Sequence, residues 1–458
     1  MTERQWREYL AFALLGRSED CPPKTGPYQD YPYFGHCGLD DIRALWTRTL
    51  SLMRSGRAPR ELGIYVHWPF CPSQCTYCYC SMAVPESGAQ MAAYVAMLKR
   101  EMDAFESLFR GTRFTSVWFG GGTPTFITDG QLDDLLGHLR GRFDLERGAQ
   151  FYLESSPATM TASKLAIMTR HGVNRVTLGI QSLDDEVLAL VDRQGQTQAS
   201  ARKAMALVRT AKDLSVDVDL VIGLEKQSRK SFFRDLLELI RWRPEVIHLY
   251  GFDPRPQTLF SEAGKRLAPL RKEEIAVAME EAEEVLRRLG YRQPLWRPER
   301  DEVEPLEERQ DGTLRKIGGS VLGFGSAAKS HAFGAGWYQH PPRGGDLPRN
   351  GGLLPFMSFA SGLDGEMREY SVRNLCLFRR VSRPAFRRVF KRDILEVAPL
   401  ARALRQLERR GLLKVGSEAL EWTGRDYAQL QIALKHLYSP QLKERLRQGH
   451  RKDLDHYR

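Results

Sequence analysis

Short apolar runs alternate with longer stretches of helical periodicity along the middle of this chain. The short runs are rich in Val, Ile, Leu and aromatic residues, which is typical of buried strands. Strands are predicted at Gly63–His67, Ser116–Phe119, Gln150–Glu154, Arg175–Ile180, Asp217–Ile222 and Val246–Tyr250. The longer stretches carry apolar residues at helical spacing, which predicts amphipathic helices. Helices are predicted at Met91–Phe109, Asp129–Arg142, Ala162–His171, Asp184–Val191, Ser200–Leu214, Ser231–Arg241 and Lys272–Leu289.

Regular alternation of strands and helices predicts parallel strands joined by right-handed crossovers. The six strand–helix units between residues 61 and 290 indicate an α/β fold with a partial (β/α)6 barrel. In such barrels the loops after the carboxyl ends of the strands carry the functional groups. We therefore expect the functional residues directly after the predicted strands.

The segments on either side of the predicted barrel differ from it in composition. Residues 1–60 form an N-terminal extension, whose aromatic, proline-rich stretch at 27–34 is expected over the barrel mouth. Gly and Pro are frequent in a second extension at 291–352, which is expected to supply a loop to the site. Residues 353–458 are arginine-rich, and a helix followed by two short apolar runs between 400 and 425 predicts a mainly helical, winged-helix-like C-terminal domain.

The chain of 458 residues carries a net charge of +11 and has a pI near 9.3, which suits an anionic partner. Basic residues are interspersed with acidic ones and with leucines on helix faces, so a nucleic-acid interface is the less favoured interpretation. Solubility, an anionic substrate or docking of an acidic electron donor explains the charge better. No apolar run reaches the length of a membrane span, so no membrane association is predicted.

Cys71, Cys75 and Cys78 follow the first predicted strand with the spacing CxxxCxxC. A cubane iron–sulfur cluster normally has four thiolate ligands. Three cysteines in one loop would leave one iron free to bind a small molecule, and these three are the predicted metal ligands. Cys80 lies two residues further on, and it either lines the site or lies beside the cluster.

Neither a zinc site nor a disulfide framework fits the cysteines as well. A structural zinc site needs a second pair of ligands elsewhere, and no Cys or His pair of that spacing follows. Disulfide frameworks belong to small secreted domains, whereas this long chain has seven cysteines and no recognisable signal peptide. Cys21, Cys37 and Cys376 are scattered and are interpreted as ordinary thiols. Free thiolates require a reducing compartment, so a cytoplasmic location is predicted.

The run from Tyr65 through His67 and Pro69 to the cysteines resembles the radical S-adenosylmethionine (SAM) superfamily. More narrowly, it is similar to the family of oxygen-independent coproporphyrinogen III oxidase, also called coproporphyrinogen dehydrogenase, with its class C radical SAM methylase relatives. The resemblance extends roughly over residues 61–330. Further matching elements follow in the order of the family: Gly120–Pro124, Glu154, Gly179–Ser182, Arg193 and Asp219–Leu224.

The resemblance implies a 4Fe-4S cluster and one or two molecules of SAM as cofactors. The glycines, which let a backbone approach a ligand closely, would contact the SAM amino group; Glu and Arg side chains would hold its amino-acid part, and an Asp would bind its ribose. The implied cofactor-binding residues are Tyr77, Gly120, Gly121, Gly122, Thr123, Glu154, Gln181, Arg193 and Asp219. The loop Gly323–Ser330 is similar to one that helps to bind a second molecule, here through Gly325, Ser326 and Ala327, and a structural turn is the alternative. Tyr65 and Lys329 are the candidate catalytic residues.

By this resemblance the protein is an enzyme that reductively cleaves SAM to a 5′-deoxyadenosyl radical. The radical would modify a small aromatic or tetrapyrrole-like substrate, with a flavodoxin- or ferredoxin-type electron donor as partner. Class C methyl or one-carbon transfer with a second SAM is favoured, because Glu225 replaces the Pro of the oxidase Gly-Leu-Pro and Asp426–Leu430 replaces its C-terminal signature. Oxidative decarboxylation of coproporphyrinogen III in haem biosynthesis is the alternative. A haem-binding or haem-trafficking protein, with His67 and His331 as candidate axial ligands, is an alternative of another class.

Overall fold

The structure is a computed structural model. It describes residues 36–78, 80–193, 195–252, 270–291, 319–340, 347–348, 352–424, 430 and 433–440. The stretch 27–34 that was predicted over the barrel mouth lies outside the described residues, as does 426–429 of the altered C-terminal signature.

One curved, mainly parallel sheet forms the centre of the molecule. Among the described residues it has eleven strands in the order β1-β11-β10-β9-β8-β2-β3-β4-β5-β6-β7. Their bounds are β1 (His36–Cys37), β2 (Leu62–Trp68), β3 (Arg113–Gly121), β4 (Asp144–Ser155), β5 (Arg175–Gln181), β6 (Ser215–Ile222), β7 (Val246–Gly251), β8 (Ser320–Phe324), β9 (Lys329–Ala332), β10 (Gly336–Gln339) and β11 (Phe356–Ala360). The strands from β8 through β2 to β7 run parallel, and the remaining pairs are antiparallel. In the described part the edge strands β1 and β7 do not pair with each other, so the predicted partial barrel is confirmed as an open sheet.

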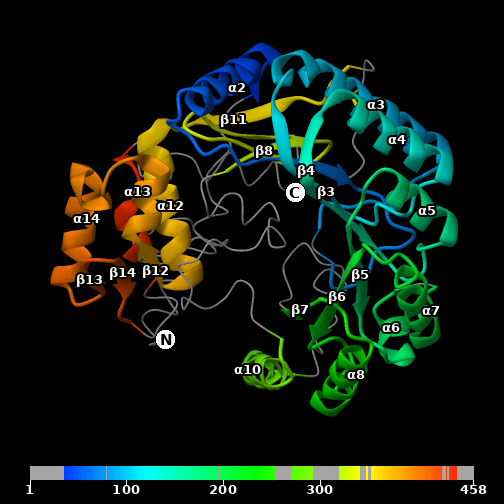
Figure 1. Ribbon diagram of the computed structural model, residues 1–458. Helices are drawn as coiled ribbons and strands as arrows, with labels where there is room; N and C mark the ends of the chain where they lie inside the picture. The colour runs from blue at the N-terminus through cyan, green and yellow to red at the C-terminus, as the bar shows by residue number, and fades with distance from the viewer. Residues whose placement is uncertain are drawn as a thin grey trace.

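Helices lie around the outer, convex side of this sheet (Figure 1). They are α2 (Leu39–Arg54), α3 (Gly88–Glu106), α4 (Asp129–Arg142), α5 (Ala162–Arg170), α6 (Asp185–Leu190), α7 (Gln198–Val208), α8 (Arg229–Arg241) and α10 (Lys272–Arg288). Each corresponds to a helix predicted from the sequence except α2. The starts of α3, α7 and α8 lie two or three residues before the predicted ones, because the hydroxyls of Ser87, Thr197 and Ser228 accept backbone N–H groups there and cap the helices. The helix α7 ends at Val208, before the predicted end at Leu214.

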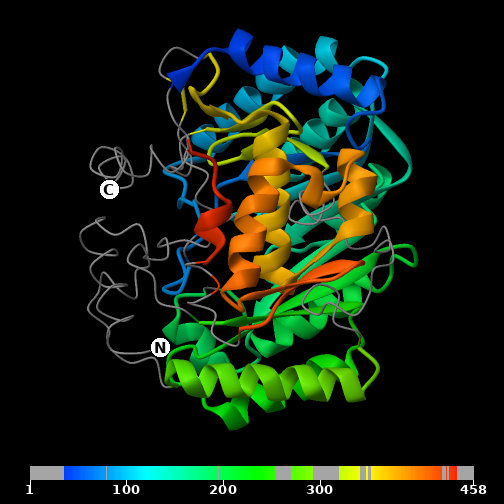
Figure 2. The same ribbon diagram turned by 90° about the vertical axis from the view of Figure 1, so that its left-hand side faces the viewer.

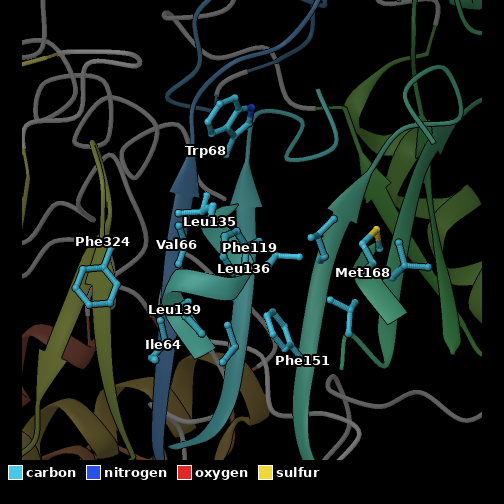
Figure 3. Packing of buried hydrophobic residues seen from close by; sticks show 14 of the residues in the cluster. Ile64, Val66, Trp68, Phe119, Leu135, Leu136, Leu139, Phe151, Met168 and Phe324 are labelled. Atoms are coloured by element: carbon cyan, nitrogen blue, oxygen red, sulfur yellow. The ribbon is translucent and has the colours of Figure 1, made fainter. Parts of the chain in front are cut away.

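The convex side of the sheet is apolar, and it packs against the helices (Figure 3). Ile64 and Val66 of β2, Phe119 of β3 and Phe151 of β4 are all at most 2% exposed. Alternate residues of a strand point to opposite faces, so the positions between them face the concave side. The labelled residues from the helices are Leu135, Leu136 and Leu139 of α4 and Met168 of α5.

Segments on both sides of the predicted barrel extend the main sheet. The strand β1 and the helix α2 come from the segment assigned to an N-terminal extension, and Nε1 of Trp46 in α2 donates to the hydroxyl of Tyr338 in β10 at 2.8 Å. The strands β8, β9 and β10 come from the Gly- and Pro-rich segment. The sheet therefore joins segments that are distant in the sequence.

The C-terminal segment forms a small second unit with the predicted winged-helix character. After α12 (Gly362–Phe378) come β12 (Arg380–Ser382), α13 (Arg383–Phe390), α14 (Ala398–Arg409), β13 (Leu413–Val415) and β14 (Ala419–Trp422). The strands pair in the order β12-β14-β13 around a separate apolar core. Figure 2 shows this unit on the open side of the curved sheet, between α2 and α10. No described helix has the length and apolar character that crossing a membrane requires.

A buried ion pair ties α3 to the strand segments beside it. Nε2 of His340 donates to Oε1 of Glu101 at 2.5 Å, and both side chains are 1% exposed. Nδ1 of His340 donates to the carbonyl of Pro355 at 3.0 Å, so both ring nitrogens carry a proton. Burial opposes the charge, but Glu101 outweighs it and raises the pKa of His340. Oε2 of Glu101 also accepts the N–H of Gly325 at 3.0 Å, which fixes the loop after β8.

Glu101→Ala should lower the free energy of unfolding by about 3–5 kcal/mol, because a buried imidazolium and a backbone N–H lose their acceptor. Urea unfolding at pH 6 measures this change. The stabilisation is complete below about pH 6.5 and declines as the pH rises through the raised folded-state pKa of His340, so the loss should shrink at higher pH. Asp134→Ala, which removes an exposed ion pair with Lys99, should cost less than about 1 kcal/mol. Equal losses in both variants would contradict this role.

Candidate functional site

The cysteines follow β2 in a loop that backbone hydrogen bonds hold in place. The N–H of Cys71 donates to the carbonyl of Ala83 at 3.1 Å, and the N–H of Ala83 donates to the carbonyl of Pro69 at 2.9 Å. Between these points, the N–H of Thr76 donates to the carbonyl of Val191 at 3.1 Å. The loop is thereby fastened both to the end of β2 and to the segment after α6.

The predicted metal ligands Cys71, Cys75 and Cys78 lie together with free, half-buried thiols. Burial raises the pKa of Cys71 to about 12, although Oγ1 of Thr123 lies 3.2 Å from its Sγ. A hydrogen bond from Cys80 lowers the pKa of Cys78 to about 7. Cys80 is exposed, so it lies at the border of the thiol group. Three converging thiols fit an iron–sulfur cluster, which binds thiolates and displaces their protons.

Arg193 connects the cysteine loop to β5. Its Nη1 donates to the hydroxyl of Tyr77 at 3.1 Å and to Sγ of Cys75 at 3.6 Å. Its Nη2 donates to the carbonyl of Gly179, and its Nε donates to Oε1 of Gln196 at 2.8 Å. The guanidinium is therefore fixed beside the thiols, where its charge favours the thiolate form.

The glycine triplet Gly120–Gly122 ends β3 in a place that has no room for side chains. A Cβ on the first glycine would lie 2.9 Å from the Glu154 carboxylate, on the second 2.6 Å from the His67 ring, and on the third 2.8 Å from the Pro69 carbonyl. The second glycine also has a φ of 112° and donates its N–H to Oε2 of Glu154 at 3.1 Å. The motif by itself suggests close approach of a ligand. In the structure, close contacts with other parts of the protein already exclude a side chain at each of these three positions.

Two acidic side chains occupy the concave side near the ends of their strands. Burial raises the pKa of Glu154 to about 8, with a contribution from the negative charge of Asp219. Burial also raises the pKa of Asp219 to about 6, against the opposing effects of His248 and of a hydrogen bond from Gln181. Gln181 adopts a φ of 67° at an irregularity in the pairing of β5 with β6. These carboxyls are positioned to bind cationic or hydroxyl groups of a ligand.

The candidate catalytic residue Tyr65 is oriented by a neutral histidine. Burial lowers the pKa of His67 to about 4. Nε2 of His67 donates to the carbonyl of Ser81 at 2.8 Å, so its Nδ1 accepts from the Tyr65 hydroxyl, also at 2.8 Å. The tyrosine side chain is therefore fixed on the concave side of β2.

The loop after β8 lies at the same edge of the sheet as the cysteines. Gly325 has a φ of 92°, and Ala327 has a φ of 61°. Ser326 is 0% exposed, and the hydroxyl of Tyr94 in α3 accepts its N–H at 2.8 Å and lies 3.1 Å from its Oγ. Ser326 thus has a structural bond to α3, whereas Lys329 is half-buried at the start of β9.

Parallel pairing brings the separate predicted residues to one end of the sheet. The carboxyl ends of β8, β2, β3, β4, β5 and β6 are neighbours in register. The cysteine loop, the glycine triplet, Glu154, Gln181 and the loop after β8 therefore lie at a common edge. This is the edge at which α/β sheets bind ligands.

Comparison with known proteins agrees with this geometry. Residues 65–240 match the family model of the Radical SAM superfamily. These residues form a radical SAM domain.

Several curated proteins resemble part of the chain. It is 34% identical over 210 residues to the oxygen-independent coproporphyrinogen III oxidase of Pseudomonas aeruginosa, covering 45% of each chain. It is 34% identical over 239 residues to the radical S-adenosyl methionine domain-containing protein 1, mitochondrial, of Bos taurus, covering 51% of this chain and 53% of that protein. A second oxidase, from Bradyrhizobium diazoefficiens, is 27% identical over 318 residues, 66% of this chain and 69% of its own. The chain spans about half the length of the first two relatives.

The fold has a counterpart among solved structures. The coproporphyrinogen III oxidase of Escherichia coli superposes with a TM-score of 0.67 at 20% identity, over 85% of this chain and 93% of that one. At this identity the match establishes the fold. Because it covers 85% of the chain, it extends well beyond the segment that matches the family model.

Trp118 belongs to the site although it is not among the residues predicted from the sequence. Its Nε1 donates to Oε1 of Glu154 at 3.1 Å, and its ring contacts Tyr65 and Tyr152 at centroid distances of 5.0 and 5.7 Å. The signal that could have identified it is the two-residue period of strands, because Trp118 lies two positions before the glycine triplet. A cavity of about 590 Å³ lies at the opposite edge, lined by Arg113, Arg140 and others, and it contains none of the predicted residues.

Glu154→Gln should flatten the pH dependence of unfolding. Because the folded-state pKa is raised from 4.5 to about 8, the wild type loses stability as the pH rises between these values. Denaturant unfolding of the metal-free protein from pH 5 to pH 8 should therefore show a steeper decline for the wild type than for the variant. Glu146→Gln, at an exposed position on the same strand, should follow the wild type. Parallel curves for all three proteins would contradict the raised pKa.

Proposed function

We propose that this protein is a radical SAM enzyme in which Cys71, Cys75 and Cys78 hold a 4Fe-4S cluster. The observation that carries the proposal is the convergence of three free thiols beside Arg193, on a loop that the chain fastens independently of any ligand. When bound, the cluster and SAM supply reductive cleavage of SAM and abstraction of a hydrogen atom from a substrate C–H bond. Cys80, whose thiol donates to Cys78, is not among the proposed ligands.

The acidic and basic side chains at the carboxyl ends of the strands are proposed to bind SAM. Glu154, with its pKa near 8, would ionise when an ammonium group comes to lie beside it. Arg193 offers a positive charge to a carboxylate, and Asp219 offers an acceptor to ribose hydroxyls. Tyr77 and Thr123 would border the cluster, because each contacts the cysteine loop or its guanidinium partner. Gln181 would hold Asp219 in place.

The concave side offers an aromatic wall to an organic substrate. The rings of Tyr65, Trp118 and Tyr152 contact one another in tilted or edge-to-face geometry along three neighbouring strands. Such a wall excludes water and suits a flat, unsaturated molecule. Tyr65 is proposed to contact the substrate, and Lys329 with the backbone of Gly325 and Ala327 is proposed to contact a second bound molecule.

Oxidative decarboxylation of a coproporphyrinogen-like substrate is the proposed reaction. Two of the three relatives described above are oxygen-independent coproporphyrinogen III oxidases, and the solved structure with the matching fold is a coproporphyrinogen III oxidase. The comparisons support this alternative better than class C methyl transfer, which Glu225 and the altered C-terminal signature favoured at the level of sequence. An acidic flavodoxin- or ferredoxin-type donor would suit the net charge of +11.

The haem-carrier alternative lacks structural support at the two histidines considered as axial ligands. Both ring nitrogens of His67 are hydrogen-bonded, to Tyr65 and Ser81. Both ring nitrogens of His331 are also engaged, by Gly319 and Glu366, and the ring is 2% exposed. Neither offers a free nitrogen to iron.

Anaerobic reconstitution with iron and sulfide, followed by SAM, dithionite and coproporphyrinogen III, tests the proposal. We expect 5′-deoxyadenosine and decarboxylated, vinyl-bearing products in the mass spectrum. S-adenosylhomocysteine with a methylated product would instead establish methyl transfer. Absence of 5′-deoxyadenosine from a fully reconstituted protein would overturn the enzyme assignment.

Each of the single substitutions Cys71→Ala, Cys75→Ala and Cys78→Ala should abolish the absorbance at about 400 nm that marks a protein-bound cluster. Formation of 5′-deoxyadenosine should fall to background in the same variants, because two thiolates do not retain the cluster. Cys37→Ala, at a free and half-buried cysteine in β1, is the matched control and should keep both signals. Cys80→Ala should also keep them. A cluster that survives loss of one of the first three cysteines would refute the ligand assignment.

A further inference from the structure

A group of buried charges on the concave side of β5, β6 and β7 has no role in the proposed cluster or SAM contacts. Asp217 of β6 is at its centre and is 0% exposed. Its Oδ2 accepts hydrogen bonds from Nε and Nη2 of Arg175 at 2.9 and 2.8 Å. The same oxygen accepts a hydrogen bond from Nε2 of His248 at 3.1 Å. The hydroxyl of Thr177 donates to the same oxygen at 3.4 Å. Two basic side chains thus converge on one carboxylate.

His248 lies at the border of the concave side. It belongs to β7, which is the edge strand of the sheet in the described part of the chain, and it pairs in register with Asp219. Its side chain is 18% exposed. The ring of Tyr250, two residues on, stacks with it at a centroid distance of 6.4 Å, and Tyr250 is 48% exposed. Among the described residues, these two rings lie at the β7 edge of the concave side.

The hydrogen bonds of His248 leave one ring nitrogen available. A carboxylate oxygen can only accept, so Nε2 carries the proton shared with Asp217. Nδ1 has no hydrogen-bond partner among the described residues. Burial lowers the pKa of His248, but the hydrogen bond to Asp217 and the charge of Asp219 outweigh it, so the pKa is raised overall. In the charged ring Nδ1 is a second donor.

The charged ring offers a hydrogen-bond donor to an acceptor group of a ligand. The groups that act on it are Asp217 and Asp219 from β6, Glu154 from β4, Arg175 from β5 and Tyr250 from β7. Arg175 and Asp217 form a buried pair that balances itself, with side chains 6% and 0% exposed. Asp219 is the proposed ribose contact. A carboxylate from a ligand would accept a charge-assisted hydrogen bond from Nδ1 of His248.

We propose that His248, oriented by Asp217, is a specificity-determining residue that binds a carboxylate of the substrate through Nδ1 at the β7 edge of the described sheet. The inference rests on the proposed function and deepens it, because it places an acidic arm of the substrate next to β7. Asp217 is a positioning residue in this arrangement. Arg175 pairs with the Asp217 carboxylate and fixes its position, so that it can hold the ring.

Binding of coproporphyrin III, a fluorescent tetracarboxylate, tests this assignment, with the neutral tetraamide of the same porphyrin as the comparison probe. Both are titrated into the full-length, reconstituted protein in the presence of SAM, and the dissociation constant of SAM is measured separately. His248→Gln removes the charge and retains a hydrogen-bonding side chain. His138→Gln, at a histidine on α4 that pairs with Asp103 of α3, is the matched control.

His248→Gln should raise the dissociation constant of coproporphyrin III about tenfold or more, which is the range expected for loss of a charged hydrogen bond. Binding of the tetraamide and of SAM should not change, and His138→Gln should match the wild type throughout. Wild-type affinity for the tetracarboxylate should also fall as the pH rises through the raised pKa of His248, whereas the variant should show only the weaker dependence that Asp219 and Glu154 cause.

Three results would overturn the inference. Equal affinity of wild type and variant for coproporphyrin III would show that the ring makes no contact, as would failure of the wild type to bind it. Parallel loss of tetraamide binding would indicate a packing role only. Loss of SAM affinity would assign the ring to the carboxylate of SAM instead. Formation of 5′-deoxyadenosine, measured on the same samples, separates these outcomes from failure of the proposed function, because it does not depend on porphyrin binding.

Discussion

The contact between the end of β3 and the turn after β2 governs the geometry of the site. Three consecutive glycines bring the β3 backbone against His67, the Pro69 carbonyl and Glu154, with separations that exclude a Cβ at each position. The same contact sets the direction in which the chain leaves β2 and therefore where the cysteine loop begins. It also aligns a backbone N–H with the Glu154 carboxylate. A side chain at any of these positions would separate the thiols from the acidic groups with which they share an edge.

The two sides of the sheet have opposite character, and this difference explains the unusual ionisation of the site. The convex side packs Val, Ile, Leu and Phe against helices, and the concave side carries Tyr65, Trp118, Glu154, Asp217 and His248. Burying charged groups is costly unless they are paired. The buried charges of the concave side are accommodated in two ways. Arg175 and His248 both pair with Asp217, and burial raises the pKa of Glu154 and Asp219, which favours their neutral forms. A charged ligand that binds on the concave side could therefore change the ionisation of these groups.

The cofactor side and the substrate side of the site depend on different residues. The thiols and the strand-end acids lie within the segment that matches the radical SAM superfamily, and their placement agrees with binding of a cluster and SAM. The substrate side depends on residues that the cofactors do not require, above all the aromatic wall and His248. With His248 on the edge strand, the two ends of the concave side differ: side chains near β2 and β3 are aromatic, and side chains near β6 and β7 are charged. This difference would orient a flat substrate that carries carboxylate side chains.

Local sequence determined much of the radical SAM domain. The helix Asp129–Arg142 was predicted with its observed bounds, and the six predicted strands became β2 to β7, because periodicity and length are properties of short segments. The CxxxCxxC spacing likewise placed three thiols in one loop. Tertiary structure alone decided that β1 and β8 to β11 extend the same sheet, that Glu101 pairs with His340 and that Asp217 holds His248. Those contacts join residues with no periodic relation in the chain, so only packing of the whole molecule brings them within bonding distance.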